Sequence, residues 1–205
     1  MILYLHGFRS SPQSFKARWM GQRLQELGRA DEYRCPQLPA SPKQAIALAL
    51  GIAETFLQTH PVAQLSLIGS SLGGYYATWL AERLGCRAVL LNPAVKPPRD
   101  LQSYVGISTQ YHSDEPFEFR PEYVAELEAL AIAAISAPQR YFLLAATGDE
   151  VLDWRESRAF YLGAKQCIIA GSDHGLSDFT QYADEVLSFC DSKPGAATPS
   201  SATGA

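Results

Sequence analysis

The sequence predicts one α/β domain with about six mostly parallel strands flanked by helices. Short apolar runs alternate along the chain with longer segments in which apolar residues recur at helical spacing. The chain has 205 residues, of which 47% are hydrophobic and 19% charged, so it can bury one sizeable core. We therefore expect a single domain over residues 1–192, followed by a short tail.

The predicted elements begin with an apolar strand at residues 2–5. After a turn-rich segment, the spacing of apolar residues predicts one face of a helix. That face contains Phe15, Trp19, Leu24 and Leu27. Residues 32–39 form a brief strand candidate with prolines at positions 36 and 39. Because proline cannot donate a ladder hydrogen bond, we expect this strand at an edge of the sheet.

The next helix has a clear start signal. Residues 41–44, Ser-Pro-Lys-Gln, form a capping box with proline at the first helical position, and apolar residues follow to about residue 57. A strand at 65–68 leads into a helix from about residue 71. The apolar face of that helix contains Leu72, Tyr76, Leu80 and Leu84. Residues 87–93 contain the apolar run Ala-Val-Leu-Leu, which suits a central parallel strand.

Periodicity lapses from residue 94 to about 121, and residues 122–135 then indicate a helix. A long segment without clear structure inside a domain is typical of a lid or binding loop, so we assign a lid to residues 94–136. The lid carries several aromatic residues: Tyr104, Tyr111, Phe117, Phe119 and Tyr123.

The last part of the domain repeats the strand and helix pattern. A strand runs into a loop over residues 140–149, a helix follows at 154–162, and the last strand and loop occupy 165–175. The final helix is marked by Phe179, Tyr182, Val186 and Phe189. Residues 193–205 are small or turn-forming, and we expect them to be disordered because they cannot bury enough apolar surface.

Charge and cysteine content exclude several classes of protein. The formal net charge is −4 without blocks of like charge, so neither nucleic acid nor an anionic membrane is an expected partner. The opening MILYLHG lacks a signal sequence, which favours a cytoplasmic location. The four cysteines lie far apart without a Cys-x-x-Cys motif, so we expect reduced thiols and no metal site. These are Cys35, Cys86, Cys167 and Cys190.

Two adjacent serines follow the strand at residues 65–68. The spacing Gly-x-Ser-x-Gly is met by Gly69, Ser71 and Gly73, whereas centring on Ser70 would need glycines that are absent. Such glycines allow a strained strand-to-helix turn that exposes a nucleophile, and the helix N-terminus favours a developing negative charge. The alternative is a serine-glycine turn that only joins strand to helix, or holds a phosphate.

A nucleophilic serine needs a base, and the chain has four histidines. His60 stands at a predicted helix end and His112 in the aperiodic segment, so we expect both to be solvated or part of the lid. His6 follows the first strand, where it can shape a loop. His174 follows the last strand, at the edge where a parallel sheet exposes its carboxyl-end loops, and is our candidate base. The alternative is a loop histidine bonded to the backbone.

The base in turn needs an orienting carboxylate. Asp149 comes first after its strand and is our candidate, with Asp153 as its rival. Asp153 stands near a predicted helix N-cap, where aspartate has a structural role. Asp173 is less suitable because adjacent side chains seldom face one another. The order Ser71, Asp149, His174 is that of the α/β-hydrolases.

An oxyanion hole completes the predicted site. One donor is the N–H of Leu72, directly after the nucleophile, and the second is the N–H of Phe8. In this prediction His6 shapes the loop after the first strand, and Gly7 permits its sharp turn.

Several strings of the sequence resemble the YqiA/YcfP-like family of small bacterial esterases, which have the α/β-hydrolase fold. The strings are "LYLHGF", "SSP", "PQLP", "GSSLGGYYATWL", "NPAV" and "TGDEVLD". The resemblance implies hydrolysis of carboxylic esters, or of thioesters, by a serine triad on a compact fold without the first two strands of larger hydrolases. It extends to about residue 190, but residues 101–135 match only loosely, and such lids commonly shape the acyl pocket.

The sequence therefore predicts a serine hydrolase that acts on a small-molecule ester or thioester without metal or cofactor. A peptidase or acyltransferase would use the same triad, and a catalytically silent binding protein is the non-enzyme alternative. The lid aromatics suggest an apolar acyl group or simply pack the lid onto the body. Arg9 and Arg99 could meet an anionic leaving group or be ordinary surface arginines. The oligomeric state is not indicated.

Overall fold

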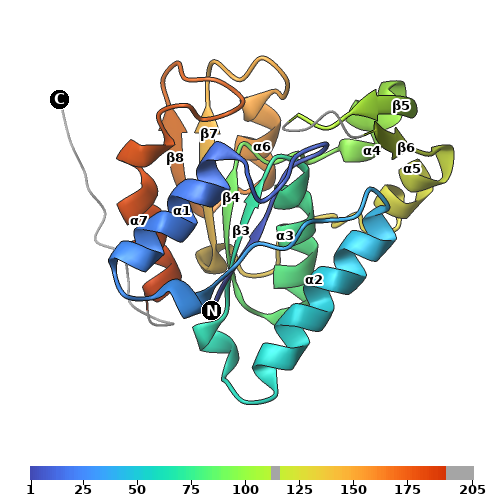
Figure 1. Ribbon diagram of the computed structural model, residues 1–205. Helices are drawn as coiled ribbons and strands as arrows, with labels where there is room; N and C mark the ends of the chain where they lie inside the picture. The colour runs from blue at the N-terminus through green and yellow to red at the C-terminus, as the bar shows by residue number, and fades with distance from the viewer. Residues whose placement is uncertain (112–115, 193–205) are drawn as a thin grey trace.

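A six-stranded parallel sheet forms the centre of the computed structural model, which describes residues 1–111 and 116–192 (Figure 1). The strand order is β2-β1-β3-β4-β7-β8, and every neighbouring pair is parallel. The strands are β1 Ile2–Leu5, β2 Tyr33–Arg34, β3 Ser66–Ser70, β4 Arg87–Leu91, β7 Tyr141–Ala146 and β8 Lys165–Ile169. The predicted edge strand is β2, which is confirmed at the edge. His112 and the predicted disordered tail lie outside the described residues.

Helices cover both faces of this sheet (Figure 1). They are α1 Phe15–Glu26, α2 Pro42–Leu57, α3 Leu72–Leu84, α4 Pro97–Leu101, α5 Pro121–Glu128, α6 Trp154–Phe160 and α7 Ala183–Asp191. Alternate residues of β1 point to opposite faces: Ile2 and Tyr4 pack with α1 and α7, while Leu3 and Leu5 pack with α2 and α3. Burial on both faces explains why the central strands are continuous apolar runs.

The start of α2 follows the predicted capping pattern. The Ser41 side chain accepts a hydrogen bond from the Gln44 N–H at 3.2 Å, with Pro42 at the first helical position, and the helix ends at residue 57 as predicted. The Ser41 hydroxyl also donates to the Glu126 carboxylate of α5 at 2.7 Å. This cap therefore connects the body of the domain to the lid.

The predicted face of α1 is partly wrong. Leu24 of that face is buried as predicted, but Phe15 and Leu27 are exposed, and the helix buries Ala17 and Met20 in their place. Both stripes have helical spacing, and α1 turns its smaller residue Ala17 inward, where the helix lies close to Tyr33 of β2. Spacing alone does not decide between two overlapping stripes on one helix.

The lid region contains more structure than the aperiodic pattern predicts. After α4, strands β5 Gly106–Thr109 and β6 Pro116–Phe119 form a two-stranded antiparallel sheet. The predicted helix at 122–135 is α5, which ends at Glu128. The carbonyl of Leu127, which would accept from Ala131 in a continuing helix, accepts instead from the N–H of Leu130 at 3.0 Å and the hydroxyl of Tyr75 at 2.8 Å. Tertiary contact thus ends the helix early.

Two further observations concern the described residues as a whole. Within 1–111 and 116–192, no helix is both long enough and apolar enough to cross a membrane. The four cysteines all lie in these ranges and are unpaired, with Cys86 and Cys190 buried and the other two partly exposed.

Candidate active site

The predicted site residues gather at the carboxyl edge of the central sheet. Ser71 directly follows β3, Asp149 follows β7 after two intervening residues, and His174 lies in the loop after β8. Because all strands of this sheet are parallel, their carboxyl ends meet at one edge, where loops from distant parts of the chain can come together.

Ser71 stands on a strained turn between β3 and α3. Its φ of 54° and ψ of −121° lie in a region that residues with a side chain seldom adopt. The flanking glycines make the turn possible. A Cβ on Gly69 would lie 2.3 Å from the carbonyl oxygen of Gly73, and a Cβ on Gly73 would lie 2.0 Å from that of Leu5. The turn therefore tolerates only glycine at both positions.

The side chains of Ser71, His174 and Asp149 form a hydrogen-bonded chain. Ser71 Oγ lies 3.0 Å from His174 Nε2, and His174 Nδ1 lies 2.9 Å from Asp149 Oδ2. Asp149 Oδ1 also accepts from the N–H groups of Val151 and Leu152, each at 2.8 Å. Since a carboxylate only accepts, Nδ1 carries the ring proton and Nε2 is free to accept from the serine hydroxyl.

Burial also separates Asp149 from its rival. The Asp149 side chain is 2% exposed, whereas that of Asp153 is 52% exposed. Asp153 is the N-cap of α6 and accepts from the Arg155 N–H at 3.0 Å, as its position in the sequence suggested. Asp173 accepts from the Ser177 N–H at 2.9 Å. The structure therefore brings Asp149, and neither of the other two side chains, to the His174 ring.

The loop after β1 passes directly beside Ser71. A Cβ on Gly7 would lie 3.2 Å from Ser71 Cβ and 3.8 Å from Ser71 Oγ. His6 is buried and holds this loop, because its Nε2 accepts from the Leu38 N–H at 3.0 Å while its Nδ1 donates to the Gly7 carbonyl at 3.0 Å. The Phe8 amide comes next in the chain. Leu72 is the first residue of α3, so its N–H has no partner within the helix. The oxyanion roles of these two amides stay predictions.

The Phe8 side chain connects the site to the lid. Its ring packs edge-on against Phe117 and Phe119, each with centroids 5.1 Å apart, and against Tyr104 at 5.7 Å. The residue whose amide is a predicted oxyanion donor therefore also anchors the hairpin β5–β6 above it.

Arg9 and Arg99, the two candidates for binding an anionic leaving group, both have partners within the protein. Arg9 donates to the Thr109 carbonyl at 2.6 Å and stacks on the Tyr111 ring. Arg99 forms a two-point ion pair with Glu156 at 2.8 and 2.9 Å. Both arginines thus connect the region predicted to be a lid, residues 94–136, to the rest of the domain.

Sequence reasoning missed residues that hold the loop carrying His174. The Glu150 carboxylate accepts from the His174 backbone N–H at 2.9 Å. Lys16 of α1 is buried and its Nζ donates to the Gly175 carbonyl. Burial lowers the pKa of Lys16 to about 8, an effect that the charges of Asp173 and Asp149 oppose. The side chain of Asn92, after β4, also reaches this loop. A polar residue right after an apolar strand was the available signal for Asn92.

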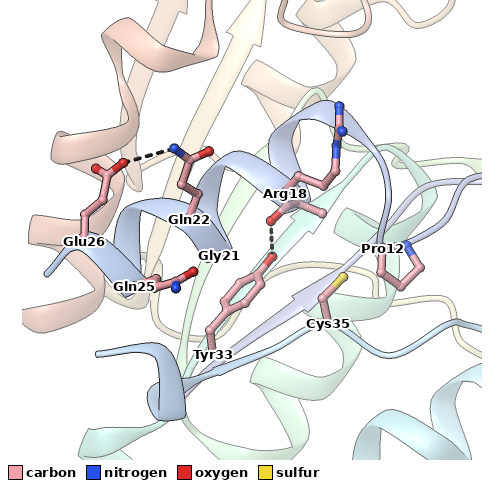
Figure 2. Close-up of a pocket in the computed structure, with 9 residues that line it drawn as sticks. Pro12, Arg18, Gly21, Gln22, Gln25, Glu26, Tyr33 and Cys35 are labelled. Atoms are coloured by element: carbon pink, nitrogen blue, oxygen red, sulfur yellow. Dashed lines mark hydrogen bonds between the residues drawn. The ribbon is translucent and has the colours of Figure 1, made fainter. Parts of the chain in front are cut away.

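A separate surface hollow lies between α1 and the edge strand β2 (Figure 2). Pro12, Gln22 and Cys35 are among its lining residues, and none of the predicted site residues is. Burial raises the pKa of the Cys35 thiol to about 12, so the thiol stays protonated and unreactive at neutral pH. Within the described parts of the chain, no cluster of three or more histidine, cysteine or acidic side chains could hold a metal ion.

Solved structures with this fold come from several organisms. One of two metagenome-derived lipolytic enzymes, LipS and LipT, is 15% identical, with 92% of each chain covered and a TM-score of 0.69. Est1E from Butyrivibrio proteoclasticus, solved with ferulic acid bound, is 14% identical over 91% of this chain and 87% of its own, with a TM-score of 0.68. The mouse alpha/beta hydrolase domain-containing protein 10 is 15% identical over 91% and 88%, with a TM-score of 0.65.

These similarities establish the α/β-hydrolase fold that the order of the predicted site residues suggested. At the level of sequence, a model of the family described as "Uncharacterised protein family (UPF0227)" matches residues 1–191. The match includes β1, the turn at Ser71 and the loops that carry Asp149 and His174.

Proposed function

Since the chain belongs to the UPF0227 family, which is YqiA/YcfP-like, we propose that it is a serine hydrolase that cleaves carboxylic esters. The observation that carries the proposal is the hydrogen-bonded chain from Ser71 Oγ through the His174 ring to Asp149, with links of 3.0 and 2.9 Å. Nucleophile, base and orienting acid have the mutual geometry that acyl transfer through a serine requires.

In the first half of the reaction, Ser71 Oγ attacks the acyl carbonyl carbon while His174 Nε2 takes the hydroxyl proton. Asp149 keeps the proton of the imidazole on Nδ1 and stabilises the imidazolium that forms. The N–H groups of Phe8 and Leu72 donate to the oxyanion. His174 then gives its proton to the leaving alkoxide as the bond between carbonyl carbon and oxygen breaks, which leaves an acyl-serine.

In the second half, water takes the place of the alcohol. His174 removes a proton from the water as it attacks the acyl-serine carbonyl, and the second tetrahedral intermediate collapses. His174 returns this proton to Ser71 Oγ, and the carboxylic acid leaves. The same steps apply to a thioester, with a thiolate as the leaving group.

The surroundings of Ser71 favour an ester with an apolar acyl group. The loop after β1 passes beside Ser71 at Gly7, and the next residue, Phe8, packs its ring against Phe117 and Tyr104 of the lid region. An aromatic cluster that begins one residue from this contact is the kind of surface that suits an apolar acyl chain. LipS and LipT are lipolytic enzymes and Est1E binds ferulic acid, which agrees with this class.

The proposal is tested with p-nitrophenyl esters of graded chain length, a matching acyl thioester and a matching p-nitroanilide, in the presence and absence of an added alcohol. We expect the wild-type protein to turn over the ester faster than the anilide and to release free acid. Ser71→Ala should lose at least about 1,000-fold in kcat, and Ser70→Ala should stay near wild type.

Three outcomes would contradict this proposal. A faster anilide reaction would indicate a peptidase, and acyl transfer to the alcohol in place of hydrolysis would indicate an acyltransferase. A folded wild-type protein without turnover of any of these substrates would indicate a binding protein.

A further inference from the structure

Asn92 lies near the centre of the carboxyl edge of the sheet that carries Ser71, Asp149 and His174, which we call the catalytic edge, although no role was predicted for it. It follows β4, the strand that lies between β3 and β7 in the sheet, and is 3% exposed. Its φ of 43° is in the left-handed region, which asparagine tolerates better than most residues. A buried side-chain amide with four hydrogen-bonding capacities needs partners, and the structure supplies them.

The Asn92 side chain bridges two loops. Its Nδ2 donates to the backbone carbonyls of Asp173 at 2.9 Å and His174 at 3.1 Å. Its Oδ1 accepts from the N–H of Ala146, the last residue of β7, at 2.8 Å. Asp149, three residues further on, is tied to the same point, because its N–H donates to the Ala146 carbonyl at 3.3 Å. The loops that carry the base and the acid thus share one buried amide.

The backbone next to Asn92 holds the nucleophile. The Ser71 N–H donates to the carbonyl of Leu91 at 3.0 Å, and the Ser71 carbonyl accepts from the N–H of Ala94 at 3.1 Å. The backbone of residues 91–94 therefore contacts the turn of Ser71. The Asn92 side chain contacts the loops that carry Asp149 and His174.

We propose that Asn92 is a positioning residue, which sets the His174 imidazole relative to Ser71 by holding the carbonyls of residues 173 and 174. The inference rests on the proposed function. Without the two donated bonds, the loop is still held by Glu150 and Lys16, but the backbone of His174 is free to shift away from β4. A shift of about 1 Å in a reacting group costs on the order of 100-fold in rate.

The test compares wild type with Asn92→Gly, which accepts the left-handed backbone but removes the side chain. The matched control is Ser66→Ala. It removes a buried hydrogen bond to the Cys190 carbonyl, 3.0 Å long, at the opposite end of β3. For each variant, kcat and KM on a p-nitrophenyl ester are measured together with deuterium uptake of the backbone at residues 171–176.

We expect Asn92→Gly to lower kcat about 10- to 100-fold with KM within about twofold of wild type, and to raise deuterium uptake in the 171–176 segment. Ser66→Ala should leave kcat, KM and deuterium uptake at residues 171–176 unchanged. If Asn92→Gly does not fold, Asn92→Asp replaces it: the carboxylate still accepts from Ala146 but cannot donate, so the same changes are expected at pH 7.5.

The proposal is overturned if folded Asn92→Gly keeps kcat within twofold of wild type, or if uptake at 171–176 does not change. An equal loss of kcat in Ser66→Ala would also overturn it, because the effect would then follow from general destabilisation. If wild type hydrolyses no ester, the proposed function fails, and the deuterium uptake alone decides whether Asn92 holds this loop.

Discussion

The catalytic edge and the lid are built by different interactions. At the catalytic edge, three loops are tied together by buried groups such as Asp149, Asn92 and Lys16, and the backbone of Ser71 is strained. In the lid, Ile107 is 79% exposed and Tyr111 is 63% exposed. The lid is attached by edge-on aromatic contacts to Phe8 and by ion pairs at the surface, and its helix α5 also accepts hydrogen bonds from the hydroxyls of Ser41 and Tyr75.

This difference suggests that the two regions have different tasks, the reaction at the catalytic edge and the choice of substrate in the lid. Buried hydrogen bonds hold atoms in one geometry, because leaving one unpaired is costly, whereas surface ion pairs contribute little and allow rearrangement. We infer that the loops of Ser71, Asp149 and His174 set the reaction, and that the exposed part of the lid around β5 adapts to the acyl group. Substitutions in the two regions should therefore differ in size and in kind.

The largest effect is expected at Asp149. Asp149→Asn should lower kcat about 1,000- to 10,000-fold, because an amide can donate to His174 and so favours the wrong ring tautomer. Asp153→Asn should stay within a few-fold of wild type, since asparagine is an equally good helix N-cap. Steady-state assays of both variants check this, and a large loss confined to Asp153→Asn would show that the acid is misassigned.

A second large effect, on stability, is expected at Gly73. The Cβ of Gly73→Ala would lie 2.0 Å from the Leu5 carbonyl oxygen, so β1 and α3 must separate, at a cost of about 4 kcal/mol or more. Gly106 in the lid has open space around it and only an unusual φ of 134°, so Gly106→Ala should cost about 1 to 2 kcal/mol. Urea unfolding measures the free energy of unfolding of both variants. Equal losses in Gly73→Ala and Gly106→Ala would contradict the contrast between the two regions.

Lys16 gives the catalytic edge a distinctive pH dependence. Its pKa is about 8 in the folded protein against 10.5 for an ordinary lysine, because burial disfavours the charge. Between these pH values the unfolded chain binds more protons, so the contribution of Lys16 to the free energy of unfolding rises with pH. The stability of wild type relative to Lys16→Met should increase by up to about 3 kcal/mol from pH 8 to pH 10.5. If the stability of wild type relative to Lys16→Met stays constant or falls between pH 8 and pH 10.5, the lowered pKa of a buried Lys16 is wrong.

The smallest effect is expected where the lid meets α6. Glu156 accepts from Arg99 and, at 3.0 Å, from Lys96, and the hydrogen bond from Arg99 is the main cause that lowers the pKa of Glu156 to about 2. These groups are partly exposed, so Glu156→Gln should cost less than about 1 kcal/mol and leave kcat nearly unchanged. A tenfold loss of kcat would mean that the contact of Glu156 with Arg99 and Lys96 helps to position the catalytic residues.

The same contrast explains what could be predicted from the sequence. Central strands and the turn at Ser71 leave local signals, because burial on both faces requires apolar runs and close backbone approach requires glycine at positions 69 and 73. The parallel sheet then brings the loops of Asp149 and His174 to the same edge. Apolar runs and glycine spacing are visible in short stretches of sequence, and the parallel topology follows from the alternation of strands and helices.

Residues that act through distant partners were not predictable in this way. Asn92 bonds to carbonyls more than eighty positions later, and Lys16 to one 159 positions later. A polar residue after an apolar strand marks Asn92 as unusual, but the neighbouring sequence does not indicate which distant groups either side chain contacts. The early end of α5 and the true face of α1 likewise depend on tertiary contacts, with Tyr75 and with β2.

The most direct test of the account is to identify the residue that a fluorophosphonate labels, by mass spectrometry of wild type, Ser71→Ala and Ser70→Ala. We expect a single labelled site at Ser71 in wild type and in Ser70→Ala, and no label in folded Ser71→Ala. Labelling that persists in Ser71→Ala, or that is lost only in Ser70→Ala, would contradict the central claim that Ser71 is the nucleophile.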